Sequence, residues 1–285
     1  MKLNLGCRAL SVHDPVQDAT IAAWLIYPTD APATPQTFGP HTIELAMDAP
    51  IVGEALPVAV VSHGQQGTPW GYRGLTTHLV HEGFAVLLVE HPGDCRRDPS
   101  LSGSAANLAN RPRHVTLALD AVLAEPALRG DVAVIGHSMG GYTALAVAGG
   151  KPMALPNQTP DGIASPVEIP RDPRVRGVVL LAPAIPWFMG PGALAEVSVP
   201  VMARIGAQDG DTPPFFVERI LKSLSPEARL DYQVVPGAGH FAFFYPVPPA
   251  LQRLAPGIDP PGFDRAAYQP RLYAEVTAFL RATLG

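Results

Sequence analysis

The clearest chemical signal in the sequence is a serine between two glycines, in the run Gly136-His137-Ser138-Met139-Gly140. An apolar segment, residues 132–135, comes directly before this run, and a segment of small residues, 139–148, follows the serine. A G-x-S-x-G run between a strand and a helix forms a tight turn that exposes the serine hydroxyl at the end of the strand. The pattern therefore predicts that Ser138 is a nucleophile rather than part of an ordinary packing turn.

A serine hydroxyl is a weak nucleophile at neutral pH, so this chemistry requires a histidine base and an acid that orients it. His240 is the only one of the nine histidines that follows Ser138, and it lies in a glycine-rich loop, residues 236–241. In proteins with this serine turn, the acid and then the histidine follow in chain order. Asp209 and Asp211, in the loop after an expected strand, both qualify as the acid. The aspartate that is not used would suit a turn or helix cap before the next proline.

Acyl transfer also needs two backbone amides that stabilise the oxyanion of the tetrahedral intermediate. Met139, the residue after the nucleophile, is the expected first donor. The second donor is expected from the loop Ser62-His63-Gly64-Gln65-Gln66-Gly67, whose glycines allow a tight backbone path. We choose Gln65, the residue after His-Gly. His63 and His137 are expected to be structural, because neither follows the nucleophile in the chain.

Regular elements of an α/β fold are expected around these residues. Continuous apolar runs at residues 56–62 and 84–89 predict parallel strands that are buried on both faces. Further strands are expected at residues 132–135, 175–181, 199–205 and 230–235. Helical patterns lie at residues 73–82, 111–123, 139–148, 215–224 and 270–284. Residues 19–27 and 42–47 alternate partly, which is typical of antiparallel strands. The order predicts a mostly parallel central sheet with helices on both faces and antiparallel N-terminal strands at one edge.

No linker divides the chain, so we expect one domain over residues 1–285. Prolines cluster in several stretches between the regular elements. One of them, at about residues 151–173, is expected to run over the sheet and is a candidate lid for the site. The mixed charges of residues 94–98 are expected to form a solvated loop.

Composition excludes several classes of protein. Of the 285 residues, 47% are hydrophobic and 16% charged, with a net charge of -5, which argues against a disordered chain. A basic run and a long uncharged apolar stretch are both missing, so neither a nucleic-acid partner nor a membrane span is expected. The first residues lack the apolar core of a signal peptide, which favours a cytoplasmic protein. Cys7 and Cys95 fit neither a disulfide framework nor a zinc site, and no cofactor or metal is expected.

Taken together, an ordered series of motifs resembles the α/β-hydrolase superfamily over about residues 6–284. The motifs are residues 62–64, 83–84, 90–93, 111–112, 136–141, 206–209 and 239–243. The series is most similar to bacterial proteins labelled predicted dienelactone hydrolases, which are similar to platelet-activating-factor acetylhydrolases. True dienelactone hydrolases use a cysteine nucleophile, whereas Ser138 holds that place here. The resemblance implies an α/β-hydrolase fold and favours Asp209 over Asp211 as the acid.

These observations predict a serine hydrolase of the carboxylesterase type. It would cleave a small-molecule ester with a small or medium acyl group through an acyl-enzyme. Trp187, Phe188 and Phe241 are candidate residues of the substrate pocket. Two alternatives stay open: a lipase-like, polyester, thioester or peptide hydrolase with the same triad, and a non-catalytic ligand-binding protein on a hydrolase fold. The sequence does not indicate an oligomeric state.

Overall fold

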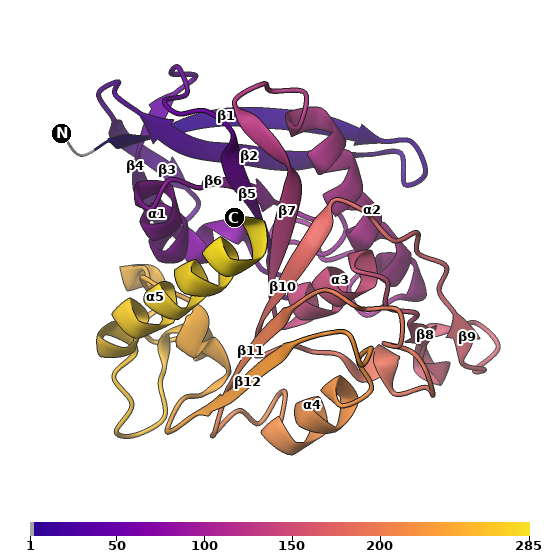
Figure 1. The fold of residues 1–285 in the computed structure, drawn as a ribbon. Helices are drawn as coiled ribbons and strands as arrows, with labels where there is room; N and C mark the ends of the chain where they lie inside the picture. Colours follow the sequence, from indigo (N-terminus) through magenta and orange to yellow (C-terminus); the bar gives the residue numbers. More distant parts are fainter. Residues whose placement is uncertain (1–2) are drawn as a thin grey trace.

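A large twisted sheet runs through the molecule (Figure 1). The computed structural model describes residues 3–285, and within them the sheet has ten strands in the order β12-β11-β10-β7-β5-β6-β2-β1-β4-β3. The strands are β1 (Asn4–Asp14), β2 (Ala19–Thr29), β3 (Thr34–Phe38), β4 (His41–Met47), β5 (Leu56–Ser62), β6 (Ala85–Val89), β7 (Leu128–His137), β10 (Val175–Leu181), β11 (Val201–Gly206) and β12 (Leu230–Val235). The six strands from β12 to β6 pair in parallel, whereas β2 joins β6 antiparallel.

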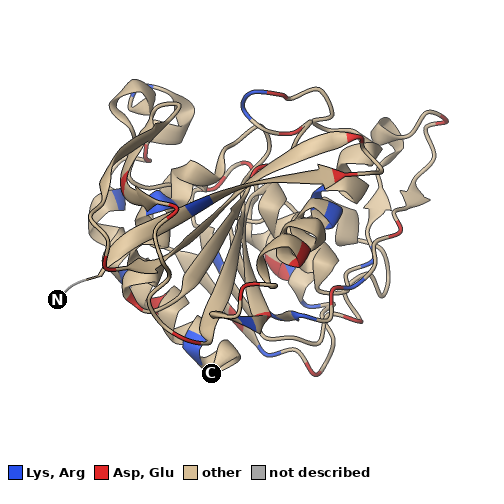
Figure 2. Ribbon diagram, turned by 90° about the horizontal axis from the view of Figure 1, so that it is seen from above, with Lys and Arg blue, Asp and Glu red and all other residues tan. Residues whose placement is uncertain are grey.

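Helices cover both faces of this sheet because successive side chains of a strand point to opposite faces. The helices are α1 (Arg73–His81), α2 (Ala105–Val122), α3 (Met139–Val147), α4 (Pro214–Leu221) and α5 (Arg265–Leu284). In β5, Val58 and Val60 pack with α2, α3 and α4, whereas Ala59 and Val61 pack with α1 and α5. Figure 2 shows that acidic and basic residues are interspersed along the fold and largely spare the central strands. A sheet that is buried on both faces requires such strands.

The predicted class is confirmed: a mostly parallel sheet with helices on both faces and antiparallel strands at the N-terminal edge. The first strand, β1, was not expected, because its exposed face carries polar residues without a clear apolar run. The starts of two helices were placed too late. Pro112 and Pro270 both lie inside helices, which begin at Ala105 and Arg265.

Side-chain caps explain these earlier starts. The Ser104 hydroxyl accepts a hydrogen bond from the Asn107 amide, and the Asp264 carboxylate accepts one from the Ala267 amide. Each cap satisfies a free amide of the first turn and so fixes where the helix begins. None of the helices within residues 3–285 is long and apolar enough to cross a lipid bilayer.

The proline-rich stretch of residues 151–173 lies beside α3 (Figure 1). It contains the two-residue strands β8 (Met153–Ala154) and β9 (Ser165–Pro166) and the short 3-10 helix η2 (Pro156–Gln158). The Trp187 indole donates a hydrogen bond of 2.7 Å to the Gln158 side chain and so attaches the stretch to the next loop.

Candidate active site

Ser138 lies in a strained turn between β7 and α3. Its φ of 52° is in the left-handed region, which residues with a side chain rarely adopt. Neighbouring backbone leaves no room for side chains at the flanking glycines. A Cβ on Gly136 would lie 2.0 Å from the Gly140 carbonyl oxygen, and one on Gly140 would lie 1.9 Å from the Ser62 carbonyl oxygen. Backbone strain of this kind persists only where the surrounding structure enforces it, and it is concentrated at functional sites.

His240 and Asp209 form a direct pair at the same end of the sheet. His240 begins the short 3-10 helix η4 (His240–Phe243) after β12, and Asp209 follows β11. The His240 Nδ1 donates to Asp209 Oδ2 over 2.9 Å, and the aspartate is buried. Because a carboxylate is an acceptor, this bond leaves the other ring nitrogen, Nε2, free to accept a proton.

Asp209 is held by the loop that follows it. Its Oδ1 accepts the amides of Asp211 and Thr212 at 2.9 and 2.8 Å, and its Oδ2 accepts the Thr212 hydroxyl at 2.6 Å. Burial raises the pKa of the Asp209 carboxyl, but the hydrogen bonds from His240 and Thr212 outweigh burial and lower this pKa overall. The turn before Pro213, which the sequence suggested for the unused Asp211, is therefore made by Asp209 itself. Both tasks fall to Asp209 because its Oδ1 accepts the two loop amides while its Oδ2 accepts the His240 ring.

Ser138 and His240 line one cavity, the Ser138 cavity, of about 530 Å³. Within residues 3–285, no hydrogen bond joins the Ser138 hydroxyl to the His240 ring. In the absence of substrate, such bonds are often long, and they tighten when a substrate is bound. The structure thus brings three residues far apart in the sequence, Ser138, Asp209 and His240, to the carboxyl ends of β7, β11 and β12. This edge is where ligands bind in open α/β sheets.

His137 positions the loop that carries the histidine of this set. Its Nε2 donates to the His240 carbonyl oxygen over 2.9 Å, so its Nδ1 must accept the Tyr72 hydroxyl, which is 2.8 Å away. Burial, assisted by the nearby His240 ring, lowers the pKa of His137 to about 3. His137 is therefore neutral and structural, as its position before the nucleophile suggested.

The loop after β5 runs directly beside Ser138. A Cβ on Gly64 would lie 3.2 Å from the Ser138 Cβ. The His63 Nδ1 donates to the Gly64 carbonyl oxygen over 2.7 Å, and its Nε2 accepts the His91 amide. Burial lowers the pKa of His63 to about 3, which keeps this ring neutral and fixes the loop.

Two amides beside the Ser138 hydroxyl are suited to bind an oxyanion. Within residues 3–285, the Gln65 amide donates no hydrogen bond, whereas the next amide, of Gln66, donates to Asp94. Met139 is the first residue of α3, where backbone amides have no acceptor within the helix. These are the two amides that the sequence predicted, and they remain a proposal.

A buried ion pair supports this loop from behind. Arg111 and Asp94 are both fully buried, and Arg111 Nη1 lies 2.8 Å from an Asp94 oxygen. Arg111 also donates to the His63 carbonyl oxygen and, over 3.0 Å, to the Thr143 hydroxyl. The expectation that residues 94–98 form a solvated loop was therefore wrong for Asp94, because burial with Arg111 compensates its charge.

Sequence comparison with family models identifies the chain. Residues 53–208 match the Hydrolase_4 family, described as serine aminopeptidase, S33. The chain belongs to this family. The matched range contains the serine turn and the loop with Gln65. It ends at residue 208, directly before Asp209. A search of curated protein sequences found no significant match.

Solved structures show that this hydrolase has the α/β-hydrolase fold. A ferulic acid esterase from Streptomyces cinnamoneus superposes with a TM-score of 0.74 at 19% identity, covering 100% of this chain and 91% of the other. A dienelactone hydrolase from Anabaena variabilis gives a TM-score of 0.59 at 19% identity, covering 100% of both chains. A dienelactone hydrolase-like promiscuous phosphotriesterase from metagenomic libraries gives 0.64 at 17% identity, covering 99% of both chains.

The lining of the Ser138 cavity differs in part from the sequence prediction. Phe241 lines this cavity, as expected. Trp187 and Phe188 do not line it: they pack on Tyr142, with ring centroids 4.9 and 5.4 Å apart. No residue of the candidate lid, 151–173, lines it either.

Sequence reasoning missed several residues that line the Ser138 cavity, namely His41, Tyr72, Arg96, Leu251 and Pro256. Leu251 and Pro256 come from the short 3-10 helices η5 (Pro249–Leu251) and η6 (Ala255–Gly257) in a second proline-rich stretch. The proline cluster there was the available signal, but composition does not show which long loop reaches a site.

A second, mostly apolar side cavity of about 340 Å³ adjoins the Ser138 cavity. The two share Ala184, Asp211 and Thr212, and the side cavity is walled by Ile185, Phe215 and other apolar residues. The Phe215 side chain is 72% exposed, so this wall is open to solvent on one side.

Within residues 3–285, one group of side chains could hold a metal ion: Asp209, Asp211 and His240, whose ligand atoms lie within 4.8 Å of one another. Asp209 and His240 are already bonded to each other, and a metal there would compete with this pair.

Proposed function

We propose that this hydrolase cleaves carboxylic esters through a serine acyl-enzyme. The observation that carries the proposal is the buried His240–Asp209 pair at the rim of the cavity that contains Ser138 on its strained turn. A base that is oriented by a buried acid next to an exposed hydroxyl is the arrangement that activates a serine. A protein that only binds ligands has no need of it.

The proposed reaction has two halves. In the first, the Ser138 Oγ attacks the acyl carbonyl carbon while His240 Nε2 takes the hydroxyl proton. Asp209 stabilises the imidazolium that forms, and the amides of Gln65 and Met139 bind the oxyanion. Collapse of the intermediate breaks the ester bond, and His240 returns its proton to the leaving alcohol. In the second half, water attacks the acyl-enzyme by the same route and releases the acid.

The cavities favour a small or medium ester. A volume of about 530 Å³ lies within the range of pockets for small molecules. The adjoining side cavity of about 340 Å³ can take one apolar half of such an ester, next to Ile185 and Phe215. Phe241 supplies an apolar wall of the Ser138 cavity beside His240.

A peptide substrate is the second candidate, because the family description is that of an aminopeptidase. The Asp211 carboxylate lines the Ser138 cavity and can pair with the α-ammonium group of a peptide. Turnover of alanine p-nitroanilide above that of p-nitrophenyl butyrate, and its loss in Asp211→Asn, would favour this candidate over the ester.

The decisive experiment compares the wild-type protein with Ser138→Ala on p-nitrophenyl acetate and butyrate and with a fluorophosphonate probe. We expect the wild type to turn over both esters and to be labelled. The variant should lose about 10⁴-fold or more in kcat and all labelling, because the residues of such a set act as a unit. A wild-type serine that stays inert to the probe would instead identify a ligand-binding protein.

A further inference from the structure

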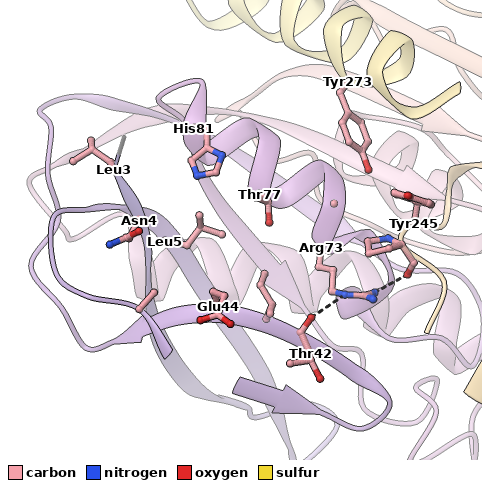
Figure 3. Close-up of a pocket in the computed structure, with 14 residues that line it drawn as sticks. Leu3, Asn4, Leu5, Thr42, Glu44, Arg73, Thr77, His81, Tyr245 and Tyr273 are labelled. Carbon is pink, nitrogen blue, oxygen red and sulfur yellow. Dashed lines mark hydrogen bonds between the residues drawn. The ribbon is translucent and has the colours of Figure 1, made fainter. Parts of the chain in front are cut away.

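A larger cavity of about 640 Å³ lies away from Ser138, between the N-terminal strands and α1 (Figure 3). Its walls come from the start of β1, from β4, from α1, from the loop at Tyr245 and from α5. The lining is mostly apolar and includes Leu3, Leu5 and Ile43. Nothing in the proposed ester chemistry uses this cavity, which we call the Arg73 cavity.

Its central feature is a nearly buried guanidinium that has no acid partner among the residues that the structure describes. The Arg73 side chain is 8% exposed. Its Nε donates to the Thr42 carbonyl oxygen over 3.2 Å, and its Nη1 donates to the Pro246 carbonyl oxygen over 2.8 Å (Figure 3). Nη1 also lies 3.0 Å from the His41 ring, whose pKa burial lowers to about 4, so that this ring is neutral.

Every hydrogen-bond acceptor of Arg73 is therefore uncharged. Within residues 3–285, no aspartate or glutamate oxygen lies within 4.0 Å of this guanidinium. Its Nη2 donates no hydrogen bond to these residues, and it is not among their fully buried unpartnered atoms. Buried charges are normally paired, so a cation with a free donor at a cavity wall is a site for an anion.

A second unsatisfied polar group lies beside it. The Tyr273 hydroxyl is buried and has no hydrogen-bond partner within residues 3–285. The ring reaches from α5 towards α1, and a Cβ on Gly74 would lie 2.3 Å from its oxygen (Figure 3). The glycine after Arg73 thus makes room for the hydroxyl. A phenol and a guanidinium together donate to the oxygens of one carboxylate.

The other residues that line the Arg73 cavity indicate the chemical class of its ligand. Leu3 and Leu5 lie across the cavity from Arg73 (Figure 3), which suits a ligand with an apolar chain. Along α1, Arg73 and His81 are about 12 Å apart at 1.5 Å per residue, the length of a medium chain. Glu44 also lines the cavity, and its negative charge disfavours a dianionic phosphate more than a singly charged carboxylate.

We propose that the Arg73 cavity binds a monocarboxylate with a medium apolar chain, whose carboxylate accepts hydrogen bonds from Arg73 Nη2 and the Tyr273 hydroxyl. The apolar chain lies along Leu5 and Ile43. The site is independent of the proposed ester hydrolysis and of Ser138.

The test is calorimetric titration with octanoate and with 1-octanol as its uncharged counterpart. We expect octanoate to bind at least tenfold more tightly than octanol, because the charge-assisted bonds to Arg73 are lost with the alcohol. Thr77→Trp, which fills the Arg73 cavity from α1, should weaken octanoate at least tenfold. Phe241→Trp, which fills the Ser138 cavity in the same way, is the matched control and should leave this affinity unchanged.

Two further variants locate the carboxylate. Arg73→Gln should weaken octanoate at least tenfold, and Tyr273→Phe should weaken it severalfold while the ring keeps its packing. If Arg73→Gln does not fold, as a melting curve would show, Thr77→Trp and Tyr273→Phe decide the question. Equal binding of octanoate and octanol, wild-type affinity in Thr77→Trp, or loss in Phe241→Trp would each overturn the proposal. So would a dimer that Thr77→Trp dissociates, because a second chain would then fill the cavity.

Discussion

The two cavities of this hydrolase differ in how their charged groups are paired. At the Ser138 cavity, the Asp209 carboxylate accepts hydrogen bonds from His240 and from its own loop, so these bonds compensate its negative charge within the protein. At the Arg73 cavity, the guanidinium meets only neutral acceptors and keeps a free donor. A satisfied pair can move a proton without reorganising its surroundings, whereas an unsatisfied charge attracts a ligand.

A thin wall separates the two regions. Arg73 Nη1 contacts His41 from one side, and the His41 ring lines the Ser138 cavity on the other. His41 also lies against Phe244, with ring centroids 5.8 Å apart. The two cavities are close neighbours, so what distinguishes them is how their charged groups are paired. Three measurements test the role of these paired groups.

The largest effect is expected from unpairing His240, the proposed catalytic base. Asp209→Asn replaces an acceptor with an amide that cannot hold the His240 Nδ1 proton in the same way, so kcat should fall by about 10³- to 10⁴-fold. Asp211→Asn, two residues away, is the matched control and should stay close to the wild type on p-nitrophenyl butyrate. If Asp211→Asn causes the larger loss, the pairing seen here is not the one used in turnover.

Acid should unfold the protein because several of its paired histidines are buried and neutral. Burial lowers the pKa of His63, His114 and His137 to about 3 each. In the unfolded chain these rings take up protons below about pH 6.5. Between these limits the unfolded state binds more protons, so the free energy of unfolding falls as the pH falls.

These three rings alone should contribute about 4 kcal/mol per pH unit to the slope near pH 5, and the buried His41 and His91 rings, whose pKa values burial also lowers, add to it. Urea unfolding followed by circular dichroism between pH 7 and 4.5 measures this slope. His63→Gln should reduce the slope by about 1.4 kcal/mol per pH unit, the contribution of one proton. A free energy that stays level over this range would show that the rings are already charged in the folded protein.

A smaller effect is expected from the Tyr72 hydroxyl, which donates to His137 and so supports the His240 loop. Tyr72→Phe leaves a buried ring nitrogen unpaired and should cost about 1–3 kcal/mol of stability. It should also lower kcat by up to about tenfold, because the loop of the base loosens. Tyr142→Phe, which removes a buried bond of 3.0 Å to the Leu108 carbonyl oxygen, is the control that loses stability with kcat unchanged.

Much of this architecture is predictable because its signals are local. Continuous apolar runs identify the parallel strands, and the glycines around Ser138 identify the turn, since only glycine fits beside the Ser62 carbonyl oxygen. His240 could be chosen because no other histidine follows the serine. The Asp209 partner also emerges from one loop, although the structure was needed to show that it makes the turn as well.

The cavity walls depend on contacts between distant segments, which periodicity does not encode. Trp187 and Phe188 follow a strand end, as a pocket residue should, yet they turn back onto Tyr142 in the core. Leu251 reaches the Ser138 cavity from a stretch without any helical or strand pattern. In the sequence, Arg73 looks like an ordinary first residue of a helix. Only the tertiary structure shows that no acidic side chain within residues 3–285 pairs with it.

Arg111 joins parts of the hydrolase that arrive from separate strands. Its planar guanidinium contacts the His63 carbonyl oxygen in the loop after β5, the Thr143 hydroxyl on α3 behind Ser138, and the Asp94 carboxylate in the loop after β6. A lysine, with a single nitrogen, has no geometry that reaches all three. Arg111 consequently holds the proposed nucleophile Ser138 and the proposed oxyanion donors Gln65 and Met139 in one fixed arrangement, whatever the shape of the loops around the cavity.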